Sequence, residues 1–328
     1  MKILIAGGGG YIGSRLIPQL LSDGHIITII DLFWFGCHLP IHANLNCIKK
    51  NLFDCTEKDL EGYDQFIFLA GVSNDPMAEF SPSKNFVYNS ALPSYLAFIA
   101  KKVGISRFIY ASSCSVYGYT EGHDVTENDI PNSIFPYGIS KLQGEKGVTY
   151  LSDNKFSTIS LRQGTVCGYS PRMRLDLVLN VMTKNALLNK KLVVNNPTIN
   201  RPILDIRDCV QAYQKSIIAP LDISGTFNVA SRNYNLLEIG SGVATAIEEK
   251  TGSKIELEVK NEIVDLYRNY RVDISQAKFI LNFNPKYTEI SNTVLDILDN
   301  ICLNDVFNWN DDQYYNIKVF SKLDKSLL

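Results

Sequence analysis

Short apolar runs along the chain alternate with longer segments in which apolar residues recur every three or four positions. Lys2–Ala6 and His25–Ile30 are runs of the first kind and suit buried parallel strands. Residues 12–21 between them carry apolar side chains at helical spacing, and Gly24 follows where a helix C-terminus favours glycine. The N-terminus is therefore predicted to form a strand, a turn, a helix and a second strand.

The same alternation continues through the first half of the chain. We predict further strands at 45–49, 65–69, 107–111 and 156–161, and helices at 83–103 and 137–151. Strands that alternate with helices pair in parallel through right-handed crossovers, and ligands bind at the carboxyl ends of such strands. The pattern predicts an α/β fold, a Rossmann doubly wound parallel sheet.

A glycine-rich turn links the first predicted strand to the first predicted helix. Gly7, Gly10 and Gly13 let the backbone approach a pyrophosphate, and the helix N-terminus offers it free N–H groups. Asp31 ends the second strand, where a carboxylate accepts hydrogen bonds from the adenosine ribose and repels a 2′-phosphate. No arginine follows Asp31 closely, so the pattern favours NAD over NADP.

Tyr137 and Lys141 are four residues apart, which places their side chains on one helix face, about 6 Å apart. They lie downstream of a strand end rich in hydroxyl groups, which includes Ser112 and Ser113. A cation beside a phenol favours the phenolate, so we expect Lys141 to lower the pKa of Tyr137. The spacing alone is weakly specific, but after a nucleotide-binding turn it predicts a site of proton transfer.

Composition limits the classes of function. The 328 residues can hold one large or two closely packed domains, and a net charge of −2 offers no basic footprint for nucleic acid. No run approaches the roughly 20 apolar residues of a membrane span, and the immediate first strand leaves no room for a signal peptide. The seven cysteines include no C-x-x-C pair, which favours a reduced, cytoplasmic protein.

His38 and His42, together with Cys37, are the residues that could suggest a metal. A convincing third ligand is absent, since the chain has only four histidines. We expect no metal and interpret this segment as a loop over the adenosine, where Trp34 and Phe35 also pack.

The pattern changes after about residue 165. A helix is predicted over 175–189, a strand from Arg201 leads into another helix, and a final helix pair follows Arg271. We predict an NAD-binding Rossmann domain over 1–165, to which later strands around 203–230 return. A smaller α/β substrate-binding domain is predicted over 166–328.

Six arginines stand on loops and element ends of this second half. They are Arg172, Arg174, Arg201, Arg207, Arg268 and Arg271. Together they suit an anionic substrate such as a diphosphate, although each one alone could equally make a surface ion pair.

Several motifs together resemble the extended short-chain dehydrogenase/reductases of the NAD-dependent nucleotide-sugar epimerase/dehydratase family. They are GGGGYIG from Gly7, Asp31, Asp54, FLAG from Phe68, Tyr88-Asn89, SSCSVYG from Ser112, YGISK from Tyr137, the Arg201 strand and RNYRVD from Arg268. The resemblance covers about residues 1–300. It implies bound NAD, a nucleoside-diphosphate sugar as substrate, and a homodimer formed through the helices at 83–103 and 137–151.

The resemblance also implies roles for single residues. Tyr137 would be the general base and acid, Lys141 would hold the nicotinamide ribose, and Ser113 would bond the reacting oxygen. The implied cofactor contacts are Gly7, Gly10, Tyr11, Ile12, Gly13, Asp31, Leu52, Asp54, Leu69, Ala70, Gly71, Asn89, Ser112, Tyr137 and Lys141. The implied substrate contacts are Ser73, Ser113, Thr165, Arg172, Arg174, Asn180, Arg201 and Arg268.

Departures from the family pattern reduce the number of reactions that we expect of this chain. The 4,6-dehydratases carry an Asp-Glu pair where this chain has Cys114-Ser115, so dehydration is not expected. Cys114 is interpreted as a small packed residue, since the partner histidine of GDP-fucose synthase is missing. Thr165 replaces a frequent substrate-binding Asn, and the SPRMRLD segment from Ser170 is similar to enzymes that act on GDP-heptose at C4.

Three hypotheses follow. The first is an NAD-dependent nucleotide-sugar epimerase that works through a 4-keto intermediate. The second is a net 4-dehydrogenase or 4-ketoreductase acting on a nucleoside-diphosphate hexose or heptose. The third is a non-catalytic NAD-binding regulator, against which the intact Ser113, Tyr137 and Lys141 argue.

Overall fold

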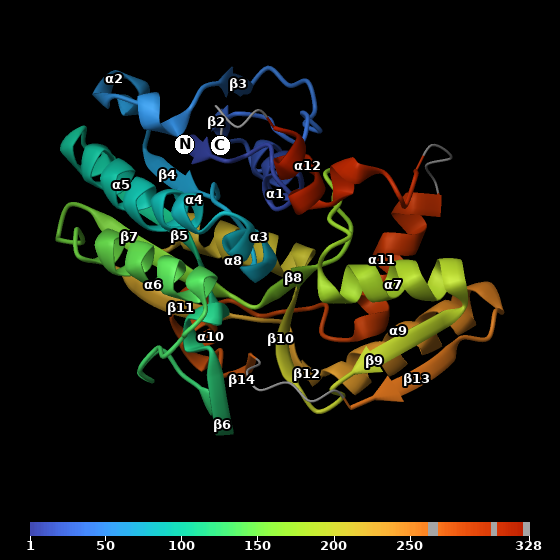
Figure 1. The fold of residues 1–328 in the computed structure, drawn as a ribbon. Coiled ribbons are helices and arrows are strands. Elements are labelled where there is room, and N and C mark those ends of the chain that lie inside the picture. Colours follow the sequence, from blue (N-terminus) through green and yellow to red (C-terminus); the bar gives the residue numbers. More distant parts are fainter. Residues whose placement is uncertain (262–267, 303–306, 324–328) are drawn as a thin grey trace.

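A computed structural model describes residues 1–261, 268–302 and 307–323, and its centre is a parallel sheet of seven strands (Figure 1). The strand order is β11-β7-β5-β4-β1-β2-β3, and every neighbouring pair is parallel. The strands are β1 (Lys2–Ala6), β2 (Ile26–Asp31), β3 (Leu45–Lys49), β4 (Gln65–Phe68), β5 (Arg107–Ser113), β7 (Ser157–Gln163) and β11 (Gly225–Val229). The predicted doubly wound parallel sheet is confirmed.

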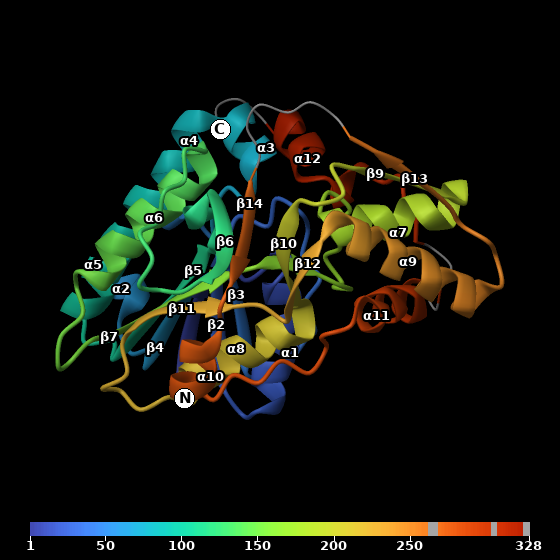
Figure 2. The ribbon, with the colours of Figure 1, turned by 90° about the horizontal axis from the view of Figure 1, so that it is seen from below.

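Helices cover both faces of this sheet (Figure 2). They are α1 (Gly13–Ser22), α2 (Glu57–Leu60), α3 (Asp75–Phe80), α4 (Pro82–Phe86), α5 (Leu92–Lys102), α6 (Pro136–Thr149), α8 (Ile206–Ile218) and α10 (Ser275–Leu281). Successive strand residues point to opposite faces: Ile3 packs in the cluster with α1 and α8, whereas Leu4 packs in the cluster with α5 and α6. Such fully buried side chains each stabilise the fold by about 1.5–3 kcal/mol.

A smaller body of helices and short strands packs against the carboxyl edge of the sheet (Figure 1). Its strands are β6 (Tyr119–Val125), β8 (Thr165–Cys167), β9 (Lys191–Asn195), β10 (Asn200–Asp205), β12 (Arg232–Asn235), β13 (Glu256–Lys260) and β14 (Asn269–Val272). Its helices are α7 (Val178–Asn189), α9 (Leu236–Thr251), α11 (Ile290–Cys302) and α12 (Asn316–Lys322). Helix α9 shows why such elements form: Asn235 and Glu238 make a capping box at its start, and Gly252 ends it at φ +70°.

We expected strands around 203–230 to return to the main sheet, and one strand of this region, β11, does so. β11 pairs with β7, and α8 packs against α1 beneath the sheet. β10, which we expected to return as well, pairs instead with β8 and β12 in a separate three-stranded sheet. The division into domains at residue 165 stays a prediction.

Three helical details differ from the sequence-based expectation. The helix predicted over 83–103 begins at Pro82 and contains a π-helical turn at Val87–Ala91. The helix predicted from residue 175 begins at Val178, because the backbone of Leu177 is extended, with φ −94° and ψ 141°. After the expected final pair, α10 and α11, a further helix α12 follows that the sequence analysis did not identify.

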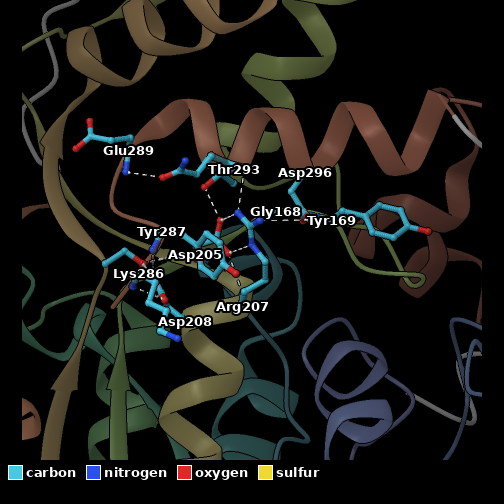
Figure 3. A network of polar contacts seen from close by, with 12 residues as sticks. Gly168, Tyr169, Asp205, Arg207, Asp208, Lys286, Tyr287, Glu289, Thr293 and Asp296 are labelled. Atoms are coloured by element: carbon cyan, nitrogen blue, oxygen red, sulfur yellow. Dashed lines mark hydrogen bonds and ion pairs between the residues drawn. The ribbon is translucent and has the colours of Figure 1, made fainter. Parts of the chain in front are cut away.

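A network of carboxylates joins the start of α8 to the C-terminal helices (Figure 3). Asp205 accepts hydrogen bonds from Arg207 and, at 2.7 Å, from the Thr293 hydroxyl on α11. Asp208 accepts from the backbone N–H groups of Lys286 and Tyr287 at 2.8 and 3.0 Å, and from the Ser231 hydroxyl. Because these bonds join segments that are distant in sequence, they hold the smaller body in place against the sheet.

Replacing Asp208 tests this anchoring role. Asp208→Ala leaves two backbone donors and a hydroxyl without their acceptor, and we expect the free energy of unfolding to fall by about 2–4 kcal/mol. Urea denaturation measures the change. Glu249→Ala, on an exposed turn of α9, is the control. It should change the free energy of unfolding by less than about 0.5 kcal/mol. Equal small losses in both variants would contradict the role.

Candidate active site

A cavity of about 510 Å³ lies at the carboxyl edge of the sheet, between the sheet and the smaller body. Its wall is formed by residues that follow β1, β2, β4, β5 and β7, with additions from the second half of the chain. The predicted residues that line it are Gly7, Gly10, Tyr11, Ile12, Gly13, Asp31, Leu52, Leu69, Ala70, Gly71, Ser73, Ser112, Ser113, Tyr137, Thr165, Arg172, Arg174, Arg201 and Arg268. This volume lies within the ordinary range for small-molecule sites.

The glycine turn is packed so tightly that larger residues do not fit. Gly7 adopts φ +76°, and a Cβ there would lie 2.5 Å from the backbone of Ala70. A Cβ on Gly13 would lie 2.1 Å from the carbonyl oxygen of Gly8. The backbone therefore meets the cavity directly in front of the N-terminus of α1, which has no side-chain cap. These features fit a dinucleotide pyrophosphate.

Asp31 is held by its own strand and by the glycine turn. Its two carboxylate oxygens accept hydrogen bonds from the backbone N–H groups of Gly9 at 2.8 Å and Phe33 at 2.7 Å. Burial raises the pKa of this carboxyl, although the backbone donors act in the opposite direction. The carboxylate lines the cavity, as a ribose-binding group would.

Tyr137 lies in the first turn of α6 and lines the cavity. The Ser113 side chain and the backbone of Asn74 lie near its hydroxyl and act to lower its pKa. Burial raises its pKa to about 12, so the expected lowering by Lys141 is wrong for the chain by itself. The cost of placing a phenolate in a buried site exceeds the help from its neighbours.

Lys141 lies behind Tyr137 rather than on the cavity wall. Its ammonium group donates a hydrogen bond to the Ala111 carbonyl at 2.9 Å and lies 5.9 Å from the centre of the Tyr137 ring. The predicted shared helix face is therefore confirmed. The side chain is only 5% exposed, and this burial lowers its pKa to about 7.

A buried ion pair supports the strand end that carries the serines. The Ser112 hydroxyl donates to Glu145 on α6 at 2.6 Å, and Arg162 on β7 donates to the same carboxylate at 2.6 Å. Cys114 is fully buried, and its thiol donates to the carbonyl of Arg162. Its packed role is therefore confirmed, and burial raises its pKa.

Four of the six arginines line the cavity, and each of them contacts protein groups. Arg174 forms a two-bond ion pair with Asp176 at 2.9 Å. Arg268 pairs with Asp75, and Arg201 donates to the backbone carbonyl of Arg268.

The other two arginines lie outside the cavity. Arg207 pairs with Asp205, and its guanidinium stacks 3.6 Å from the centre of the Tyr287 ring. Arg271 pairs with Asp124 on the exposed β6–β14 ribbon.

Two further predicted contacts lie outside the cavity wall. Asp54 is exposed beyond it, and its neighbours Asn51 and Leu52 line the cavity instead. Asn180 is fully buried: its amide accepts from Gly168 and donates to Tyr11, so it orders the turn behind the wall.

Asn89 also lies behind the wall. Its amide nitrogen donates to Val72 at 2.8 Å and to Asn85 at 2.9 Å. A Cβ on Gly71 would lie 2.3 Å from the Asn89 amide oxygen. Asn89 therefore shapes the loop after β4 from below, and this close contact requires glycine at position 71.

Sequence reasoning missed several lining residues, which are Asn74, Asp75, Gln163, Asp176, Tyr270, Asn316 and Phe320. The position of Asn74 and Asp75 directly after β4 was a usable signal, because strand ends form the site in this fold. For Asn316 and Phe320 the sequence carries no such signal.

The segment that contains His38 and His42 contributes aromatic side chains to the cavity wall. Trp34 and Phe35 line the cavity, as expected of this loop. Over the described residues, no group of three or more His, Cys, Asp or Glu side chains has the arrangement of a metal site. Nor do the described helices include one that is both long and apolar enough to span a membrane.

Comparison with known proteins adds an independent line of observation. The model of the NAD dependent epimerase/dehydratase family matches residues 3–230. The uncharacterized UDP-glucose epimerase YtcB of Bacillus subtilis is 32% identical over 303 residues, which are 87% of this chain and 93% of that protein. UDP-glucuronic acid decarboxylase 6 of Arabidopsis thaliana is 26% identical over 301 residues, 87% of this chain and 84% of that protein.

A solved structure shares the fold. The UDP-glucuronic acid 4-epimerase of Bacillus cereus, crystallised with UDP-glucuronic acid and NAD, superposes with a TM-score of 0.79 at 24% identity. The match covers 92% of this chain and 99% of that chain. At this identity the likeness shows the architecture alone.

The buried lysine generates a test by pH. The pKa of Lys141 is about 7 in the folded chain and near 10.5 when unfolded, so the folded chain binds fewer protons between these values. Its contribution to stability therefore rises from pH 7 towards pH 10.5, by at most about 1.4 kcal/mol per pH unit. We expect the free energy of unfolding of cofactor-free protein to gain more between pH 7 and 9 in the wild type than in Lys141→Met. Parallel curves would mean that the folded lysine keeps its proton.

Proposed function

This chain belongs to the NAD dependent epimerase/dehydratase family, and we propose that it epimerises a nucleoside-diphosphate sugar through a 4-keto intermediate. It is an enzyme of the extended short-chain dehydrogenase/reductase type, and its cofactor is NAD. The names of its relatives include both epimerases and decarboxylases, so membership alone does not decide the reaction. The observation that carries the proposal is that Tyr137 and Ser113 lie close together on the wall of a cavity that also contains the glycine turn.

When bound, NAD supplies the acceptor and donor of a hydride at the reacting sugar carbon. Tyr137 would take the proton from the hydroxyl on that carbon and return it when the ketone is reduced. Ser113 would hold the same oxygen, since its side chain lies beside the Tyr137 hydroxyl on the cavity wall. In the chain alone Tyr137 keeps its proton, because its pKa is about 12, and a cation brought into the cavity would lower that value.

The diphosphate of the substrate would meet the arginine side of the cavity. Arg201 and Arg268 lie together there, since Arg201 bonds the backbone of Arg268. The Arg268–Asp75 pair would hold the guanidinium ready for a phosphate, because this planar group can donate two parallel hydrogen bonds to two phosphate oxygens.

The residue that follows Ser113 favours epimerisation over dehydration. Elimination needs a second acid/base group beside Tyr137, and Cys114 at that place is buried with a raised pKa. The cavity carboxylates among the described residues are Asp31, Asp75 and Asp176, and each already has protein partners. Because one oxygen of Asp75 has no hydrogen-bond partner among the described residues, the preference for epimerisation rests on Cys114 and not on these carboxylates.

A homodimer is part of the proposal. Tyr95 and Phe98 on α5 are 51% and 54% exposed, and Tyr150 at the end of α6 is 88% exposed. Helices α5 and α6 pack side by side, so this helix pair exposes three aromatic side chains that a second copy of the chain could cover. The same two helices carry the dimer that the sequence resemblance implies.

The experiment is incubation of the purified protein with a panel of nucleoside-diphosphate sugars, including UDP-glucose, UDP-glucuronic acid and GDP-heptose. Absorbance follows free NADH, while chromatography and mass spectrometry resolve the products. A sugar isomer of unchanged mass without free NADH is the expected result. NADH in proportion to a product two hydrogens lighter would instead identify a net 4-dehydrogenase. Binding without any turnover would favour a regulator.

Replacing Tyr137 tests the assignment of the base. Tyr137→Phe keeps the ring but removes the hydroxyl, and we expect turnover to fall at least about 100-fold while NAD stays bound. Product assays measure turnover, and absorbance of denatured protein measures retained NAD. Tyr63→Phe, before β4 and away from the cavity, is the matched control and should keep full activity. Comparable turnover in both variants would remove Tyr137 from the mechanism.

A further inference from the structure

The C-terminal segment, residues 307–323, forms part of the cavity wall although it lies far beyond the residues that the family model matches. It contributes Asn316 and Phe320, both on α12, which packs beside α3 in both views (Figures 1 and 2). Asn316 is 6% exposed and Phe320 is 1% exposed. An exposed tail would bury neither residue, so the segment is an integral part of the site.

Asn316 joins the two sides of the cavity. Its amide nitrogen donates to the Ser73 hydroxyl at 3.0 Å, in the loop that follows β4. Its amide oxygen accepts from Arg172, in the loop that follows β8. The amide nitrogen and the amide oxygen of this one side chain therefore bond to two different loops.

Arg172, which the sequence analysis assigned to the substrate, lies on the adenosine side of the cavity. Its guanidinium stacks 3.8 Å from the centre of the Phe35 ring, four residues after Asp31. The side chain is 2% exposed, and its Nε has no hydrogen-bond partner among the described residues. A buried, partly unpaired guanidinium in a cavity wall suits an anion such as a phosphate.

Phe320 closes the wall next to this arginine. Its ring packs edge-on against Trp34 at 5.3 Å and against Phe80 at 6.1 Å. Trp34 in turn packs against Tyr88 at 6.2 Å, and both line the cavity. The rings of Phe320, Trp34 and Tyr88 therefore surround the end of the cavity that lies beyond Asp31. Adenosine binds at this place in such a fold.

Residues 307–323 also bond to the smaller body. The Tyr314 carbonyl accepts from the backbone of Leu175, and the Tyr314 ring stacks on Phe307 at 4.7 Å. Lys184 on α7 donates to the Tyr315 hydroxyl. The segment thus spans the mouth of the cavity from the smaller body to α3.

We propose that residues 307–323 form a cap that retains NAD, in which Asn316 holds Arg172 over the cofactor diphosphate and Phe320 closes the adenosine end. Release of NAD then requires the cap to detach from Ser73 and Trp34. A retained cofactor is what an enzyme without net oxidation needs, because the same NAD serves successive turnovers. The inference rests on the family's NAD and stands independently of which sugar is turned over.

The test measures how fast NAD leaves the loaded protein. Holoenzyme is mixed with excess alcohol dehydrogenase and ethanol, which convert each released NAD to NADH and report it by absorbance. We expect Asn316→Ala and Phe320→Leu to release NAD about 10- to 100-fold faster than the wild type. Ser321→Ala, on the exposed face of α12 with a hydroxyl bonded within its own helix, should release it at the wild-type rate.

A second measurement guards against variants that fail to fold. In the wild type, hydrogen exchange of the amides in residues 314–323 should slow when NAD is added, because the cofactor and the cap stabilise each other. Unchanged exchange in this segment would overturn the proposal, as would folded variants that release NAD within twofold of the wild-type rate. Both readouts are independent of sugar turnover, so they separate failure of the cap from failure of the epimerase assignment.

Discussion

The parallel direction of the seven strands is the constraint on which the site depends. Because all of them point the same way, the residues that follow β1, β2, β4, β5 and β7 meet at one edge of the sheet. There the loops after β1 and β4 approach so closely that Gly7 and Ala70 leave no room for a Cβ on the glycine. The contact that shapes the cofactor turn is therefore set by strand order, and Asn89 supports the same loop from below through its contact with Gly71.

Burial sets the resting protonation states of Tyr137 and Lys141. Burial raises the pKa of Tyr137 to about 12 and lowers the pKa of Lys141 to about 7. In both cases it favours the neutral form of the side chain. The proton thus rests on the phenol until charge enters the cavity. The arginines follow a related rule, since Arg174 and Arg268 pair with Asp176 and Asp75 at the cavity wall. These two guanidinium groups therefore keep a carboxylate partner at the wall, whereas the Nε of Arg172 has no hydrogen-bond partner among the described residues.

The cavity is completed by segments that are remote in sequence. The carboxylate network at the start of α8 holds α11 and the loop before it, and this places the second half of the chain over the sheet edge (Figure 3). The C-terminal segment closes the remaining side through Asn316 and Phe320. The proposed retention of NAD and the proposed binding of a substrate therefore depend on the same long-range packing.

The sequence by itself determined the elements whose cause is local. Apolar periodicity located six of the seven strands of the main sheet, all except β11, and the glycine turn, Asp31, Ser113 and Tyr137 follow from their places at strand ends and on one helix face. Tertiary structure alone decided properties that depend on what lies around a side chain. Burial reversed the expected pKa shift of Tyr137, and packing placed Asp54 and Asn180 outside the cavity wall. Strand pairing drew β10 into a separate sheet, and only the fold brought Asn316 to Arg172, because no local pattern encodes a contact across 144 residues.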